Sequence, residues 1–197
     1  MTSTQWALLI AAAISFFWMI GAYNRLVRLK NAIVNAFAQT DVQLKRRYDL
    51  IPNLVEAARA YLQHERATLE AVTEARDQAR NANDAVRARP ANAAAVAALG
   101  AAEQVLDTTL GRFFALTEAY PDLKADERIR DLSEELTSTE NKVAFARQAY
   151  NDAALVYNNA CDQFPTLLIA RIFSFAPSGM LQSTQSAAQR EAVLVKL

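Results

Sequence analysis

The sequence predicts an all-α protein in which an N-terminal transmembrane helix continues into an elongated antiparallel four-helix bundle. One basis is composition, because only 4 of the 197 residues are glycine and 5 are proline, while alanine and other helix-favouring residues are abundant. A β-sandwich or barrel would need many more turn residues. The other two bases are an uncharged apolar N-terminal run and apolar residues spaced three and four apart along the rest of the chain.

Residues 1–24 contain no charged side chain and are predicted to form a membrane anchor. The apolar run from Trp6 to Tyr23 would extend about 27 Å as a helix, close to the roughly 30 Å of a bilayer hydrocarbon core. Trp6 and Tyr23 stand at its two ends, where amphipathic aromatic residues prefer the membrane–water interface.

Three cations, Arg25, Arg28 and Lys30, follow the apolar run directly. A cleaved signal peptide is the alternative to an anchor, but it requires positive charge before the run, and none is present. By the positive-inside rule, the cations place the N-terminus outside and the body in the cytoplasm. They are also the candidate contacts for lipid headgroups.

Residues 25–165 are predicted to form the cytoplasmic bundle. Since neither proline nor glycine interrupts residues 22–51, the anchor and the first bundle helix are expected to form one rod, which ends near residues 45–48. Asp49 and Pro52 then indicate a turn and a new helix start. The remaining expected elements are a second helix carrying Ile51 to Ala79, a loop over 80–90, a third helix after Pro90, and a fourth from about Lys124 to Phe164, where Pro165 stops it.

Several polar residues stand on the apolar faces of these predicted helices. Buried charges are costly unless they are paired, so we expect interhelical ion pairs and hydrogen bonds that fix the helix register. A ligand site is the alternative interpretation. The residues are Glu65, Arg76, Glu140, Asn141, Arg147 and Asn151.

The predicted path brings the fourth helix back towards the bilayer, where the apolar segment 166–177 follows. This segment is too short to span a membrane. It would either lie in the membrane interface or form a flap packed on the end of the bundle. The candidate interfacial residues are Leu167, Leu168, Ile172, Phe173 and Phe175. Residues 178–197 are expected to form a flexible C-terminal tail.

Few residues offer chemistry, and we predict no catalytic site, no metal site and no cofactor. The single histidine, His64, excludes a site that needs a histidine pair and is expected on the surface. The single cysteine, Cys161, excludes an intramolecular disulfide and is expected to be buried. No glycine-rich phosphate-binding pattern occurs, and zero net charge argues against a nucleic-acid partner.

Several stretches together resemble the LemA family of bacterial membrane proteins. Their order and spacing agree over about residues 20–177, and the blocks that carry the resemblance are Tyr23–Val27, Asp41–Val55, His64–Glu65, Ala75–Arg76, Glu118–Lys124, Glu134–Thr137, Thr139–Asn141, Ala144–Arg147, Tyr150–Ala153, Tyr157–Asn158 and Phe164–Pro165. The resemblance implies one anchor, an external N-terminus and a cytoplasmic helical body at the bacterial inner membrane. It implies no catalytic residues.

The expected function is therefore a non-enzymatic, membrane-anchored helical scaffold that assembles with itself or with partner membrane proteins. Two alternatives stay open. One is a membrane-shaping or lipid-sensing protein, based on the basic cluster and the apolar segment 166–177. The other is an adaptor for an envelope quality-control protease, which rests on architecture alone.

Overall fold

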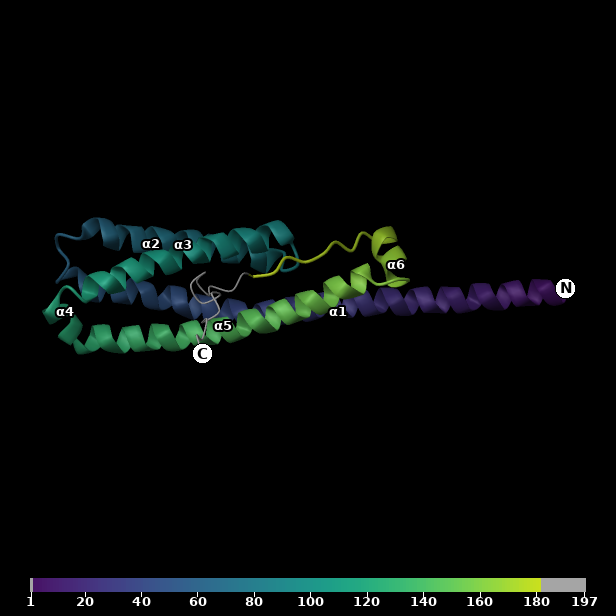
Figure 1. Cartoon of the computed structure of the whole chain (residues 1–197), viewed down its shortest axis with the longest axis horizontal. Helices are drawn as coiled ribbons and strands as arrows, with labels where there is room; N and C mark the ends of the chain where they lie inside the picture. Colours follow the sequence, from purple (N-terminus) through teal and green to yellow (C-terminus); the bar gives the residue numbers. More distant parts are fainter. Residues whose placement is uncertain (1, 182–197) are drawn as a thin grey trace, which may run out of the picture.

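The computed structural model describes residues 2–181, and all of its regular structure there is helical, as the sequence predicts. The long helices run up and down along one axis, with the N-terminal part of the first projecting alone beyond the bundle (Figure 1). The helices are α1 (Ser3–Arg59), α2 (Arg66–Ala88), α3 (Ala93–Thr117), α4 (Pro121–Ala125), α5 (Glu127–Asp162) and α6 (Thr166–Ile172).

Helix α1 is a single rod of 57 residues that serves as both the apolar extension and a bundle helix. At 1.5 Å per residue its length is about 85 Å. Its first buried residue is Ala22, and only 6% of its most apolar 18-residue window is buried. The helix is therefore long and apolar enough to cross a bilayer, and every residue from Thr2 to Trp18 is exposed.

The bundle is antiparallel. Helix α1 packs along α5 and on α2, and α2 packs along α3. The short helix α4 turns the chain from α3 into α5 at the end of the bundle far from the N-terminus (Figure 1). Apolar side chains spaced three and four apart on α1 lie fully inside the core, including Leu26, Ile33, Phe37 and Leu44. Phe37 meets Tyr150 of α5 edge to face, with ring centroids 5.9 Å apart.

The helix boundaries predicted around Pro52 are wrong. Helix α1 does not end near residue 48 but continues through Pro52 to Arg59, so Ile51, Val55 and Ala58 belong to α1. The chain turns instead at residues 60–65. Most of the loop predicted over 80–90 is also helical, because α2 continues to Ala88 and the chain turns over residues 89–92.

A side chain from α2 explains why the helix survives its proline. Pro52 has no N–H, so the carbonyl of Tyr48, four residues earlier, loses its helical donor. The Nε of Arg76 donates a hydrogen bond to that carbonyl oxygen at 3.0 Å. The Arg76 side chain is only 14% exposed, so the bond is largely shielded from water. Arg76 thus replaces the missing donor and ties α2 to α1 at this point.

We predict that Pro52 and Arg76 are energetically coupled. Arg76→Met should lower the free energy of unfolding by about 1–3 kcal/mol, because it leaves a buried carbonyl without a donor. In a Pro52→Ala background the loss should be smaller, since the alanine introduced there has an N–H that can donate to the Tyr48 carbonyl. Urea unfolding of the detergent-solubilised chain, followed by circular dichroism, measures this double-mutant cycle. An equal loss in both backgrounds would contradict the proposed compensation.

Candidate functional site

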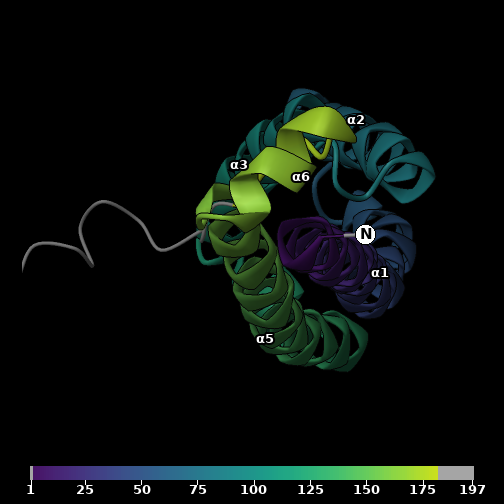
Figure 2. The same ribbon diagram turned by 90° about the vertical axis from the view of Figure 1, so that its right-hand side faces the viewer.

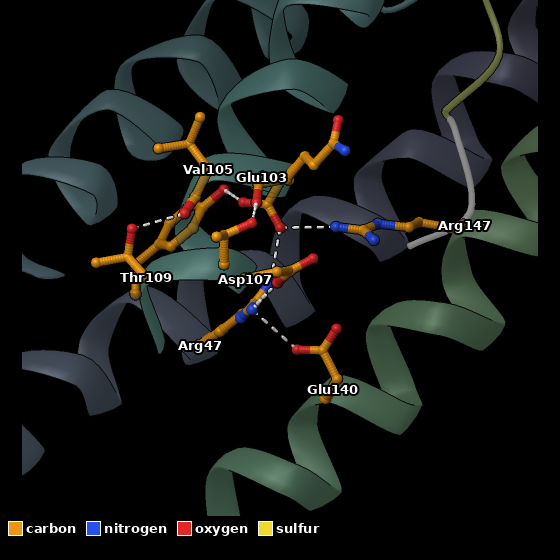
Figure 3. A network of polar contacts seen from close by, with 10 residues as sticks. Arg47, Glu103, Val105, Asp107, Thr109, Glu140 and Arg147 are labelled. Carbon is orange, nitrogen blue, oxygen red and sulfur yellow. Dashed lines mark hydrogen bonds and ion pairs between the residues drawn. The ribbon is translucent and has the colours of Figure 1, made fainter. Parts of the chain in front are cut away.

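A network of charged side chains crosses the middle of the bundle. It joins Arg47 of α1, Glu103 and Asp107 of α3, and Glu140 and Arg147 of α5 (Figure 3). The two arginines and Glu103 are buried, while Asp107 and Glu140 are 25% and 35% exposed. Glu140 and Arg147, two of the predicted seam residues, both form interhelical ion pairs.

Glu103 is the centre of the network. One carboxylate oxygen, Oε2, accepts hydrogen bonds from Arg47 Nη1 at 2.8 Å and from Arg147 Nη2 at 2.6 Å. The other, Oε1, accepts from the hydroxyl of Tyr48 at 2.6 Å. Burial, followed by the neighbouring Glu103 charge, raises the pKa of Tyr48, so its hydroxyl stays protonated and acts as a donor. One buried carboxylate therefore holds donors from both α1 and α5.

Arg47 connects Glu103 to the outer carboxylates. It contacts Asp107, and its Nη2 lies 3.1 Å from an oxygen of Glu140. Burial lowers the pKa of Arg47, but the charges of Glu103, Asp107 and Glu140 outweigh this effect and raise it above its usual value. Arg47 is therefore permanently cationic and compensates part of the negative charge around it.

The network has three carboxylates and two guanidinium groups, so it is negative when all are ionised. Burial raises the pKa of Glu140, and the carboxylates of Asp107 and Glu103 add to this, while Arg47 and Arg147 oppose it. The charged form of Glu140 is thus disfavoured relative to water.

A shallow groove of about 400 Å³ opens beside the network, between α3 and α5. The groove is lined both by charged and by apolar side chains. The charged residues are Arg47, Asp107 and Glu140, and the apolar residues include Leu110, Phe114 and Leu136. The predicted seam residue Asn141 is exposed and lines this groove. Arg47 Nε and Asp107 Oδ2 make no hydrogen bond to any group that the structure describes. Within residues 2–181, no group of three or more His, Cys, Asp or Glu side chains is placed to hold a metal ion.

A second polar contact joins α1 to α2. Asp41 Oδ1 accepts a hydrogen bond from Asn83 Nδ2 at 2.6 Å, and Lys45 Nζ lies 2.7 Å from Asp41 Oδ2. Of the other seam residues, Arg76 supports the Pro52 region, and Glu65 accepts a long hydrogen bond, 3.5 Å, from the Tyr120 hydroxyl. Five residues of these polar contacts were not predicted from the sequence: Asp41, Arg47, Asn83, Glu103 and Asp107.

The C-terminal strap, residues 174–181, packs against the bundle. Asn158 makes two hydrogen bonds to the backbone of Ser178, accepting from its N–H at 2.8 Å and donating to its carbonyl at 3.0 Å. Asn151 holds Leu181 in the same way, with both bonds at 2.8 Å. Residues 178–181, which belong to the expected flexible tail, are thus held to α5 by hydrogen bonds from Asn151 and Asn158. Residues 182–197 lie outside the described part of the chain.

Helix α6 lies where α1 leaves the bundle. The ring of Tyr23 meets Phe173 and Phe175 edge to face, with centroids 4.9 and 5.6 Å apart. Of the candidate interfacial residues, Leu168, Ile172 and Phe173 are exposed, whereas Leu167 and Phe175 are half-buried. Arg25, Arg28 and Lys30 are also exposed, and Trp6 lies on the projecting part of α1. His64 is exposed in the turn before α2, and Cys161 is buried in α5.

Comparison with known proteins identifies the family. A model of the LemA family matches residues 36–197, a range that begins inside α1 beyond its apolar extension and covers most of the bundle. The chain belongs to the LemA family. It is also similar to protein LemA of Metamycoplasma hominis, with 24% identity over 177 residues, or 90% of this chain and 76% of that protein. The family predicted from the sequence blocks is therefore confirmed.

We predict that two glutamates of this LemA family protein differ sharply when each is changed to glutamine. Glu103→Gln should lower the free energy of unfolding by about 3–5 kcal/mol, because it leaves Arg47 and Arg147 buried without their shared carboxylate. Glu140→Gln should leave the protein at least as stable at pH 7, since burial disfavours the charge that it removes. Thermal unfolding of the detergent-solubilised chain measures both.

The stability of the parent protein and of Glu140→Gln can also be compared as a function of pH. Because the pKa of Glu140 is raised in the folded state, the folded protein binds this proton more tightly than the unfolded chain. The parent should therefore gain stability from Glu140 as the pH falls through its raised pKa towards the ordinary value of 4.5, and Glu140→Gln should lack this gain. A Glu140→Gln variant as unstable as Glu103→Gln would contradict this account.

Proposed function

We propose that this LemA family protein is a single-pass, non-enzymatic scaffold that assembles with itself at the bacterial inner membrane. The observation that carries the proposal is the course of α1, which passes without a break from an exposed apolar extension into the centre of the bundle. Side chains such as Leu8 and Phe17, each 71% exposed, would be buried by lipid. Because a continuous helix joins the bundle to its anchor, the bundle would be held rigidly relative to the membrane.

The charges at the base of the bundle favour one orientation. Arg25, Arg28 and Lys30 are exposed on α1 directly after its apolar part. Cations that flank a span are retained on the cytoplasmic side. The proposed topology therefore has the N-terminus outside and the bundle in the cytoplasm, where Cys161 would remain reduced.

The outward face of α5 is the proposed surface for self-assembly. Phe145, Ala149 and Val156 follow one another on this face at intervals of four and seven residues, and Leu155 lies beside them. Phe145 is 75% exposed, and Leu155 and Val156 are about half exposed. Exposed apolar residues gathered on one helix face are typical of an interaction surface.

Membrane anchoring favours a second copy as the partner. Copies in one bilayer share the same orientation, so a two-fold axis parallel to α1 brings the α5 face of one copy against the same face of its neighbour. Such an interface is isologous, and each residue lies close to its own counterpart near the axis. Confinement to two dimensions also raises the effective concentration of the neighbouring face.

We predict that a cysteine at Ala149 will crosslink two copies. In this experiment Cys161→Ala first removes the natural cysteine, and a short bismaleimide is then applied to native membranes. Ala149→Cys should give a dimer, and adding Phe145→Glu should remove it. Ala38→Cys, at an exposed alanine on α1, is the matched control and should stay monomeric. Light scattering of the gently extracted chain should report an oligomer.

Other outcomes point to other functions. A monomeric mass together with no Ala149 dimer would overturn self-assembly. A crosslink from Ala149 to a different membrane protein would favour a heteromeric scaffold, or an adaptor if that protein is a protease. Equal crosslinking from Ala38 and Ala149 would show that α5 is not the interface.

A further inference from the structure

We propose that α6, with Phe164 before it and Phe173 after it, is a helix that lies flat in an anionic phospholipid surface and gives the body a second attachment to the membrane. The inference rests on the membrane anchoring proposed above for α1. It concerns a different part of the molecule, the short helix that follows α5.

Helix α6 ends at the depth at which the apolar span of α1 ends. From Ser3 to Tyr23 the helix rises about 30 Å, which matches the hydrocarbon thickness of a bilayer. Tyr23 then lies at the interface, where tyrosine is favoured. Because the Tyr23 ring contacts both Phe173 and Phe175, the end of α6 lies at the same level as the end of the span.

Helix α6 also runs across the axis of the rod. Viewed from the anchor side, along the rod, α6 crosses the end of the bundle from α5 towards α2 (Figure 2). The axis of α6 is therefore steeply inclined to α1, and a bilayer crossed by α1 would have α6 lying along its surface. Helices that bind membranes without crossing them lie in this plane.

Several large apolar side chains in and beside α6 are exposed. The buried face of α6 carries Thr166, Ile169 and Ala170. Apart from Ile169 and the half-buried Leu167, the large apolar side chains of α6 and of the two flanking phenylalanines are exposed, with fractions of 81% for Phe164, 51% for Leu168, 68% for Ile172 and 48% for Phe173. A flap that closes a bundle end would bury its largest side chains. Here they point to where the bilayer surface would lie, which favours the interfacial alternative over the flap.

Exposed cations surround these apolar side chains. Arg171 is exposed on α6, and Arg25, Arg28 and Lys30 are exposed on the adjoining part of α1. None of these four cations takes part in an ion pair with the described residues. Clustered cations beside a span attract anionic headgroups. An anionic phospholipid surface thus satisfies both the apolar and the charged side chains.

Helix α6 is also held in place before any lipid binds. Ser174, with φ of 55°, ends the helix, and the Phe175 N–H donates to the Ala170 carbonyl at 2.9 Å in a Schellman motif. The Tyr157 hydroxyl then donates to the Ala176 carbonyl at 3.1 Å, and Asn158 holds Ser178. A prefolded helix loses little entropy on binding. With α1 it gives two attachment points, which restrain rotation of the body about the rod.

The test measures membrane depth at three single positions in the full chain with Cys161→Ala. Nitroxide labels are placed at Ile10, Ile172 or Gln63 in nanodiscs that contain phosphatidylglycerol. Accessibility to oxygen and to a water-soluble nickel chelate is then measured. The Ile172 label should be protected from nickel and accessible to oxygen, as at Ile10, whereas Gln63, in the turn far from the anchor, should be open to nickel.

The outcomes separate the two proposals. An Ile172 label as open to nickel as Gln63, with Ile10 still protected, would overturn the α6 proposal and leave the anchor intact. An Ile10 label open to nickel would overturn the anchor itself. Leu168→Glu should expose the Ile172 label without affecting Ile10, and helix content by circular dichroism should not change. Equal protection of Ile172 in purely phosphatidylcholine nanodiscs would overturn the requirement for anionic lipid.

Discussion

The carboxylate of Glu103 is the interaction on which the rest of the bundle depends. Helices α1 and α5 form one packed pair and α2 and α3 another, and the described backbones of α3 and α5 make little close contact. Glu103 projects from α3 and accepts hydrogen bonds from Arg47 and Tyr48 of α1 and from Arg147 of α5. A slide of any of these helices by one turn would strand a buried charge. Apolar seams alone tolerate such slides better, so the network selects one register.

Because α1 is continuous, it connects the charge network directly to the apolar N-terminal extension. A break at Pro52 would have made the far end of the bundle a separate hairpin. The hydrogen bond from Arg76 to the Tyr48 carbonyl allows the rod to pass the proline, and Tyr48 itself donates to Glu103. The proline, its compensating arginine and the charge network therefore occupy one continuous region. Motion of the apolar extension is transmitted directly to this region, because no flexible linker lies between them.

The fold class, the antiparallel order and the family followed from the sequence because each rests on patterns repeated over many residues. The helix boundaries near Pro52 could not be predicted from the sequence. Proline favours the first turn of a helix, but here the hydrogen bond from Arg76, which lies 24 residues later in the chain, allows α1 to continue past it. Glu103 was open to prediction: it stands four residues after Leu99 and three before Leu106, both buried, and so occupies a core position. The C-terminal strap could not be predicted. Asn151 and Asn158 bind its backbone, so the strap sequence carries no complementary side chains that would indicate the contact.

The placement of α6 follows partly from its own sequence and partly from its surroundings in the fold. Its apolar character is visible in the sequence, but seven residues are too few for periodicity to say which face is buried. The answer comes from its surroundings: small Thr166 and Ala170 fit against the bundle, while the strap fixes the segment from its C-terminal side. Since the strap is bound through its backbone and Thr166, Ile169 and Ala170 fill the contact with the bundle, the remaining large side chains, such as Leu168 and Ile172, are not needed to hold α6 in place. They are left free to face the surface at which α1 emerges, which explains how large apolar residues remain exposed at this end of an otherwise well-packed bundle.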